Sequence, residues 1–409
     1  MPEPLGATTG LAWCRRPISL PLVLWHTTER RTSGVPQNSG RAASAPPTDE
    51  PGGGLGGGSG GGSGGRAERA PGSVRFMELS DYQVVDTRDV DTMLFGMFMP
   101  QGWKMELSGI DGAANKWQTA VDIAMRIEEL GYDSIWVYDH FHNVPKPAHE
   151  AVFECWTTMA AISQRTSRVR LGQMVGCNSY REPAVLAKIT STVDVISGGR
   201  LDWGIGAGWY ENEYKGYGFE FRRPRDRIGM MRETVQIVRS MWTEPETTFE
   251  GEYYRLERAQ CDPKPLQSPH PPIWIGGGGE QLTLRAVARF ADCANFGGKP
   301  DEWARKREIL KGHCAAVGRD EATIRKTWSP EVFLRSTEAE LEEAGSRSFW
   351  GEPLDSWKAG NLVGTPEQVC EKIQTYLSLG CTGFVPWCSD YPSTETLELF
   401  AAEVMPNFR

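Results

Sequence analysis

The feature that most constrains this chain is an alternation of short apolar segments with longer amphipathic ones, which starts near Met93 and runs to the C-terminus. Leu94–Met99 is a short apolar run, typical of a strand that is buried on both faces. Lys116–Leu130 follows with apolar residues at helical spacing and stops at Gly131. The expected strands are Leu94–Met99, Ser134–Tyr138, Val169–Val175, Leu201–Ile205, Pro272–Ile275, Asp292–Phe296, Ile324–Leu334 and Gly383–Trp387. The expected helices are Lys116–Leu130, Phe153–Gln164, Pro183–Ile196, Arg227–Trp242, Glu280–Phe290, Asp301–Val317, one that opens at Thr365, and Thr394–Glu403.

Roughly eight strand–helix units in about 315 residues favour the α/β class and a (β/α)₈ TIM barrel with insertions. One insertion is the hairpin-like segment Thr248–Glu257. An open doubly wound sheet is the alternative. In a barrel, the chemistry gathers at the carboxyl ends of the strands, so the loops that follow the strands are where a site is expected.

The segment before this pattern has a different composition. Residues 1–75 are rich in Gly, Ser, Pro and Arg and end in the glycine run Gly52–Gly65. Such a segment buries too little apolar surface to offset its ordering entropy, so we expect a disordered tail. The apolar stretch Ile18–Trp25 only faintly resembles a targeting peptide, and Met77 or Met93 could be the true start. The catalytic domain is expected to span 76–409.

Composition excludes several classes of protein. The net charge of −9 argues against a nucleic-acid binder, which needs clustered Lys and Arg. No apolar run reaches the ~18–20 residues of a membrane span. The nine cysteines form no Cys-x-x-Cys pair and indicate reduced, mostly buried thiols in a cytoplasmic protein.

A polar pair, Asp139 and His140, follows the second expected strand. The imidazole of His140 could act as acid, base or hydrogen-bond donor. A purely structural strand-end pair is one alternative. Metal binding by His140, His142 and His149 is another, although no Glu-His motif at helical spacing supports it.

The loop after the third strand begins at Gly176 and ends at Pro183, which opens the next helix. Gly176 with its small and polar neighbours Cys177 and Asn178 lets the backbone approach a flat ligand closely. We therefore assign Cys177 and Asn178 to the wall of a cofactor site, while an ordinary connecting loop remains an equal reading.

Glycine-rich loops also follow the fourth and fifth strands. In the first, 204–208 reads Gly-Ile-Gly-Ala-Gly, but a Rossmann turn needs a further glycine where Trp209 stands. This loop, and Gly208 in particular, suits the rim of a pocket for a planar ring. In the second, Gly276–Gly279 precede Glu280 and an expected helix start, an arrangement that favours an anion or phosphate over a plain flexible turn.

No nucleophile elbow and no sequence-local Cys–His pair is present, so a reaction in which a cofactor carries the difficult step fits best. Five ordered motifs then give the chain from Leu94 to Arg409 a specific resemblance. It resembles the luciferase-like flavin oxidoreductase superfamily, and most of all its branch that depends on the deazaflavin coenzyme F420. The motifs are SIWVYDHF, RLGQMVGCNSYREPAVLAK, GGRLDWGIGAGWYENEY, PPIWIGGGG and VGTPEQV.

The resemblance implies a barrel with the cofactor bound at the carboxyl ends of the strands. It implies that Asp139 and His140 lie near the deazaflavin ring, with His140 as candidate acid or base. It also implies that Asn212 contacts the cofactor.

Further positions follow from the same resemblance. Met174 and Val175 match a site that often holds a non-proline cis peptide against the ring, and Gly276–Gly279 match the loop that takes the cofactor phosphate. Trp209 departs from some sugar-phosphate dehydrogenases of this branch, which have a Glu there that takes part in their chemistry, so their substrate is not carried over. The nearby Glu211 is a further candidate for the chemistry.

These observations predict an oxidoreductase that transfers hydride between F420 and a small organic substrate. The alternative is an FMN-dependent luciferase-like monooxygenase that uses dioxygen. A metal-dependent barrel hydrolase and a non-catalytic flavin binder are the remaining readings. The resemblance also implies a homodimer, and no nucleic-acid, membrane or metal partner is expected.

Overall fold

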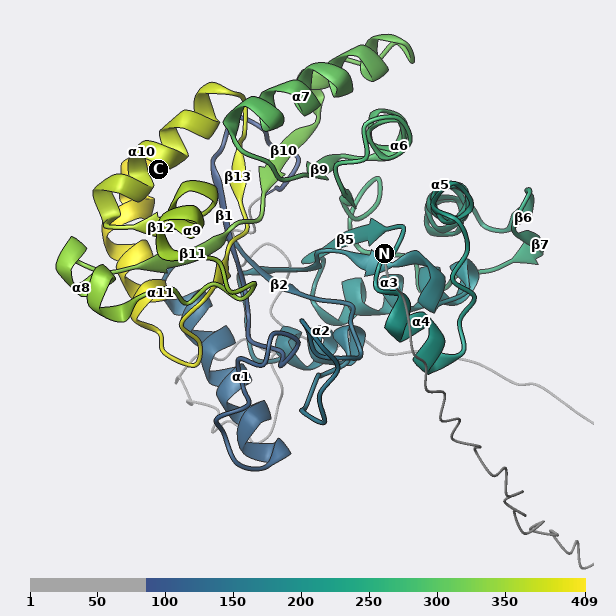
Figure 1. Ribbon diagram of the computed structural model, residues 1–409. Helices are drawn as coiled ribbons and strands as arrows, with labels where there is room; N and C mark the ends of the chain where they lie inside the picture. Colours follow the sequence, from purple (N-terminus) through teal and green to yellow (C-terminus); the bar gives the residue numbers. More distant parts are fainter. Residues whose placement is uncertain (1–85) are drawn as a thin grey trace, which may run out of the picture. The chain divides into compact units, whose positions relative to one another are not determined.

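The computed structural model describes residues 86–409, and its centre is a closed barrel of parallel strands (Figure 1). The ring closes because β3 pairs with β5 and β1 pairs with β13. The barrel strands, in the order in which they pair, are β1 (Leu94–Phe98), β2 (Ser134–Val137), β3 (Arg170–Gln173), β5 (Leu201–Gly206), β8 (Ile273–Gly276), β9 (Cys293–Asn295), β10 (Arg325–Trp328) and β13 (Gly383–Phe384). The predicted (β/α)₈ barrel is therefore confirmed. The domain boundary expected at residues 75–76 lies outside the described residues.

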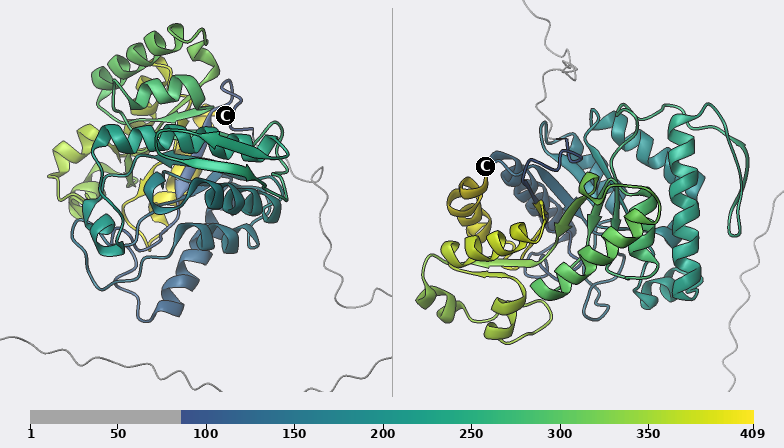
Figure 2. Two further views of the ribbon diagram at one scale, coloured as in Figure 1. Left: turned by 90° about the vertical axis from the view of Figure 1, so that its right-hand side faces the viewer. Right: turned by 90° about the horizontal axis from the view of Figure 1, so that it is seen from above.

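Helices surround this barrel, as Figure 2 shows from two further directions. The main ones are α1 (Ala113–Glu129), α2 (Cys155–Ser163), α3 (Pro183–Ile196), α5 (Pro224–Thr243), α6 (Thr283–Phe290), α7 (Pro300–Ala315), α10 (Pro366–Ser378) and α11 (Glu395–Leu399). Proline occupies the first turn of α3, α5, α7 and α10, where no backbone N–H is needed. α10 begins with the predicted capping box of Thr365 and Gln368.

Two predicted strands are each divided in the structure. The expected strand Ile324–Leu334 consists of β10 and β11 (Glu331–Leu334), and Gly383–Trp387 consists of β13 and the start of β14 (Trp387–Cys388). Pro330 and Pro386 lie at the breaks, and proline lacks the N–H that a ladder needs. Beyond the breaks, β11 pairs with β14 on one side and with β12 (Leu362–Gly364) on the other.

Several short elements were not expected from the sequence. They are α4 (Glu211–Tyr217), α8 (Glu338–Ala344), α9 (Leu354–Gly360), β4 (Gly176–Cys177), the 3₁₀ turns η2 (Asn178–Tyr180) and η3 (Glu321–Thr323), and the π and 3₁₀ turns η4 (Phe400–Val404) and η5 (Met405–Phe408) that follow α11. The predicted hairpin is present as β6 (Thr247–Glu250) and β7 (Arg255–Ala259), which project beside α5 (Figure 1). α6 begins at Thr283, three residues later than expected, and α4 forms where a loop was predicted.

Large aromatic side chains fill the barrel. Trp136 of β2 and Trp274 of β8 are fully buried and meet edge to face at 4.6 Å. The strands on both sides of β2 carry glycines: a Cβ on Gly96 or Gly172 would lie 2.6 Å or 2.4 Å from the Trp136 side chain. These glycines are required because the indole occupies the space of three strands.

A buried polar cluster closes the opposite end of the barrel, where the strands begin. Arg170 and Asp202 form a buried ion pair at 2.8 Å, and Thr87 donates to the same carboxylate at 2.8 Å. Arg325 donates to the carbonyl oxygens of Thr87, at 2.7 Å, and Thr92, at 2.9 Å. The segment that precedes β1 is therefore part of the folded body.

The cysteines of the described residues are free thiols, and all of them except Cys370 are buried, as the sequence predicts. Between residues 86 and 409, no helix combines the length and apolarity that crossing a bilayer requires.

Candidate functional site

A cavity of about 380 Å³ lies at the carboxyl ends of the strands, where the barrel rule places chemistry. It joins an aromatic end, around His140, to a glycine-lined end, around Gly277. Its lining residues come from the loops after most of the barrel strands and are Trp103, Tyr138, Asp139, His140, Met174, Val175, Gly176, Cys177, Tyr180, Gly206, Ala207, Gly208, Trp209, Gly276, Gly277, Thr283, Asn295, Trp350 and Trp387.

His140 is held on two sides. Its ring stacks on Trp103 with the centroids 4.1 Å apart and the planes 1° from parallel. Its Nδ1 lies 2.8 Å from Oε2 of Glu213. Because Nδ1 is engaged, Nε2 is the ring nitrogen that can exchange a proton with a ligand, and it has no hydrogen-bond partner among the described residues.

Glu213 is the carboxylate that organises this end of the site. It is fully buried and also accepts hydrogen bonds from the backbone N–H groups of Phe141 (2.6 Å) and His142 (2.9 Å) and from the Tyr180 hydroxyl (2.7 Å). Burial raises the pKa of Glu213, but the hydrogen bonds and charge of His140 and the other donors outweigh it, and the pKa lies below its usual 4.5. Glu213 is therefore an ionised partner for His140.

The sequence prediction selected Glu211 and not Glu213. Both glutamates lie in α4, and their side chains point in different directions. Two residues along a helix turn the side chain by roughly 200°, so Glu213 points into the protein while Glu211 faces outward. Glu211 is half exposed, pairs with Lys215 at 2.8 Å and does not line the cavity. Asn212 is exposed and does not line it either.

Asp139 also lines the cavity, but its carboxylate is already engaged. It forms two hydrogen bonds with Arg181, at 2.7 Å and 3.0 Å, and accepts from the backbone N–H of Cys177 at 2.8 Å. Its main contribution is to fasten the end of β2 to the loop after β3. Arg181 also pairs with Glu154 at 2.7 Å.

One cluster of residues with metal-ligating groups occurs in the described part of the chain, formed by Asp139, Glu154 and Cys155. The Arg181 guanidinium already neutralises its two carboxylates, and His140 is not a member. Burial raises the pKa of the Cys155 thiol well above 9.0, which disfavours the thiolate that a metal would need.

The floor of the cavity is built around Val175, and the peptide bond between Met174 and Val175 is cis. A Cβ on Gly206 would lie 2.4 Å from one Val175 methyl group, and a Cβ on Gly276 would lie 2.6 Å from the other. The glycines at the ends of β5 and β8 are therefore required by the packing of Val175, which brings three strand ends close together.

Gly208 and Cys177 form one side wall. Gly208 has a φ of +75°, and a Cβ there would lie 2.0 Å from the Tyr214 hydroxyl. That hydroxyl lies 3.2 Å from the Cys177 sulfur. Burial raises the pKa of the Cys177 thiol to about 12, so Cys177 serves as wall and not as nucleophile. Asn178 is buried but does not line the cavity.

The glycine loop forms the other end of the cavity. Gly276 and Gly277 line it, whereas Gly278 and Gly279 lie beyond it, between Lys306 and Thr283. Among the described residues, the backbone N–H groups of Gly278 and Gly279 have no acceptor. The start of α6 adds positive potential, and the Lys306 ammonium, which pairs with Glu302 at 2.7 Å, lies nearby. This loop is therefore suited to an anionic group.

The aromatic walls were not predicted from the sequence. Trp103 and Trp350 come from loops and Trp387 comes from the start of β14. These segments are distant in the chain, and no local motif marks them. Trp209 and Trp350 are half exposed at the rim, with 55% and 51% of their surface accessible. Exposed tryptophans beside a cavity are typical of a site that receives a flat ligand.

The chain is similar in sequence to enzymes named as F420-dependent dehydrogenases. It is 29% identical, over 320 residues, to an F420-dependent glucose-6-phosphate dehydrogenase of Kineococcus radiotolerans. This match covers 70% of this chain and 92% of that protein. It is 36% identical, over 180 residues, to an enzyme of the same name from Amycolatopsis mediterranei, where the match covers 43% of this chain and about half (51%) of the relative's length.

Solved structures show the same fold at lower identity. An F420-dependent secondary alcohol dehydrogenase in complex with an F420-acetone adduct matches with a TM-score of 0.66 and 21% identity, over 78% of this chain and 99% of that chain. The oxygenating constituent of 3,6-diketocamphane monooxygenase from Pseudomonas putida, in complex with FMN, matches with a TM-score of 0.62 and 20% identity, over 78% and 99%.

The family model for luciferase-like monooxygenases matches residues 93–359, which is more than half of the chain. With the closed barrel and the cavity at the carboxyl ends of its strands, this match makes the chain a member of the luciferase-like monooxygenase family.

Proposed function

We propose that this chain is an oxidoreductase that binds coenzyme F420 in the main cavity and exchanges hydride with a small organic substrate. The observation that carries the proposal is one cavity with His140 and its aromatic neighbours at one end and the glycine loop at the other. The aromatic end suits a flat ring, and the glycine-lined end suits a phosphate. The names of the relatives supply the identity of the cofactor.

The residues present fit such a group. Cys177, Gly208 and the pair Met174–Val175 would form the walls and floor against the ring, and Gly276–Gly279 would take the phosphate. The open N–H groups of the glycine loop support the second assignment, because phosphate needs such donors. Asp139 would hold this wall through Arg181 and Cys177.

When bound, a deazaflavin supplies hydride transfer, and the chain has to supply the proton. His140 would hold or release this proton at Nε2, with Glu213 fixing the tautomer through Nδ1 and stabilising the protonated ring. The sequence-derived candidates Glu211, Asn178 and Asn212 lie outside the cavity lining and remain predictions. The sugar-phosphate substrate of the relatives is not transferred, since Trp209 cannot exchange a proton.

FMN with dioxygen is the second candidate, supported by the FMN complex among the structures with the same fold. Fluorescence titrations of the full chain with F420 and with FMN separate the two. We expect F420 to bind at least ~10-fold more tightly. Tighter binding of FMN would favour the monooxygenase, and binding of neither would refute the proposal.

The role of His140 is tested in the loaded protein. H140A should retain F420 but lose on the order of 10²-fold in kcat, since it removes the proton carrier and leaves the glycine loop intact. Unchanged turnover would indicate that another group moves the proton, and it would favour a non-catalytic role for His140.

We further infer a cytoplasmic homodimer. Val185 and Ile196 of α3 are exposed apolar residues, at 55% and 40%, beside an apolar groove between α2 and α3. Such a surface gains from burial against a second copy. Light scattering coupled to size exclusion should give twice the mass of the chain, and a monomer would contradict this inference.

A further inference from the structure

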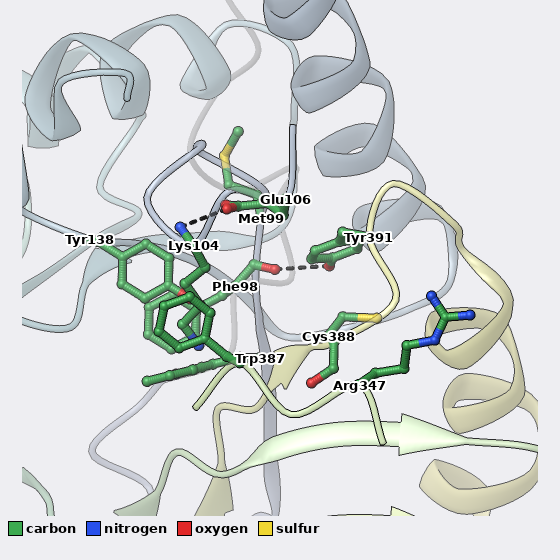
Figure 3. Close-up of a pocket in the computed structure, with 11 residues that line it drawn as sticks. Phe98, Met99, Lys104, Glu106, Tyr138, Arg347, Trp387, Cys388 and Tyr391 are labelled. Carbon is green, nitrogen blue, oxygen red and sulfur yellow. Dashed lines mark hydrogen bonds between the residues drawn. The ribbon is translucent and has the colours of Figure 1, made fainter. Parts of the chain in front are cut away.

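A second, smaller cavity opens beside the main one, and it is shown in Figure 3. This side chamber has a volume of about 150 Å³, and we define it by Lys104, Tyr138, Arg347, Phe349 and Trp387. Tyr138 and Trp387 belong to the walls of both cavities. The chamber therefore lies directly beside the space assigned to cofactor and substrate.

The wall between the two cavities is aromatic. Trp103 stacks on His140 and also lies 4.4 Å from the ring of Tyr138, while Tyr138 and Trp387 meet edge to face at 5.8 Å. The chamber is thus separated from the proposed proton carrier by single aromatic rings, and Tyr138 and Trp387 face both spaces.

The cation inside the chamber is Lys104. Lys104 is half-buried, and its ammonium group lies over the ring of Trp387, 5.2 Å from the centroid of Phe349 and 5.7 Å from that of Tyr138. Among the described residues, it has no hydrogen-bond acceptor and no ion-pair partner within 4.0 Å. Burial lowers the pKa of Lys104 well below its usual 10.5. An ammonium group that is partly withdrawn from water and has no acceptor is costly unless a ligand supplies one.

The two nearby carboxylates are occupied by other donors. Glu106 accepts from the backbone N–H groups of Gln101, Gly102 and Lys104, at 2.8–2.9 Å. Glu331 accepts from the Trp357 indole at 2.7 Å. They therefore fix the loop after β1 and the base of the chamber, and neither closes an ion pair with the Lys104 ammonium.

Arg347 adds a second cation, on the far side of the chamber (Figure 3). It is exposed, comes from the segment between α8 and α9, and has no ion pair among the described residues. The chamber is thus flanked by one half-buried and one exposed positive group, with apolar rings between them, and the carboxylate of Glu106, which is engaged by backbone donors, also lies in its lining. This combination selects a small anion on an apolar body.

We propose that the side chamber binds the carboxylate end of the organic substrate, with Lys104 as the residue that determines this specificity and Arg347 assisting at the rim. The inference rests on the proposed function, because that function identifies the ligand of the chamber as part of a substrate. A monoanionic carboxylate fits better than a phosphate dianion, because the chamber is small and the nearby charges of Glu106 and Glu331 repel a second negative charge more strongly.

The test uses benzoate and benzamide, which share shape and differ in charge, titrated by calorimetry into the full chain without cofactor. We expect benzoate to bind at least ~10-fold more tightly than benzamide, since a charge-assisted hydrogen bond to a half-buried cation is worth about that factor. K104M should abolish the preference, and R347Q should reduce it by less. K311M, the same change at an exposed lysine of α7, should leave it unchanged.

Equal affinities of the two probes, no benzoate binding, or an unchanged preference in K104M would each overturn the proposal. Because K104M replaces a half-buried cation that has no acceptor with an apolar side chain of similar length, it should fold and should not unfold at a lower temperature than the parent, which circular dichroism checks. These titrations contain no cofactor, so failure of the proposed function would appear separately, as failure of the F420 and FMN titrations.

Discussion

At the scale of single residues, the site depends on which of two glutamates reaches His140. Glu211 and Glu213 lie in the same stretch of sequence and have the same chemistry, but only Glu213 is buried and contacts the imidazole. An ionised partner behind a histidine raises its ability to carry a proton and fixes its orientation.

We therefore expect E213Q to lower kcat on the order of 10²-fold while the affinity for cofactor changes little, because the charge behind His140 is lost and the fold is kept. The pH profile of kcat should shift as well, which a purely structural role would not produce. E211Q is the matched comparison at the exposed position. A larger loss in E211Q than in E213Q would reinstate the sequence prediction.

At the scale of elements, three strand ends meet on one side chain. Val175 lies against the glycines that end β5 and β8, so the width of the cavity floor is set by backbone contact and not by ligand space alone. This contact explains Gly206 and Gly276. Without it, both glycines would be assigned entirely to cofactor binding.

G276A should then destabilise the protein by about 1–3 kcal/mol, because the new Cβ would lie 2.6 Å from the Val175 methyl group. Adding V175A should recover part of the loss, since it removes that methyl group. Urea unfolding of both variants, with V175A alone as reference, measures the coupling. Additive effects of the two changes would show that Val175 is not the obstacle.

At the scale of the whole molecule, the barrel needs the segment before its first strand. Thr87 and Thr92 supply acceptors to buried Arg325, and Thr87 also satisfies Asp202. These groups close the end of the barrel that lies opposite the site.

A chain that starts at Met77 keeps these contacts, whereas one that starts at Met93 loses them. We expect the shorter chain to be destabilised by on the order of 3 kcal/mol, because the buried Arg325 guanidinium loses the carbonyl acceptors of Thr87 and Thr92. Thermal unfolding of the two chains and of the full chain decides this. Equal midpoints for both shortened chains would contradict the assigned role of Thr87.

The fold could be predicted from the sequence, because the alternation of apolar runs and amphipathic segments is a local property. Backbone hydrogen bonding then leaves few ways to bury such runs. The loops after the strands were also located correctly, and they do meet around one cavity. What sequence reasoning missed was the splitting of β10–β11 and β13–β14, although Pro330 and Pro386 were visible signals.

Only the tertiary structure decided which side chains face the cavity. The choice of Glu213 over Glu211 depends on the direction in which each side chain leaves α4. The aromatic walls are formed by Trp103, Trp350 and Trp387, which come from segments far apart in the sequence. Likewise, the chamber around Lys104 exists because a loop after β1 meets a segment between α8 and α9. Periodicity specifies what is buried along one element, but the contacts between elements arise only when the barrel closes.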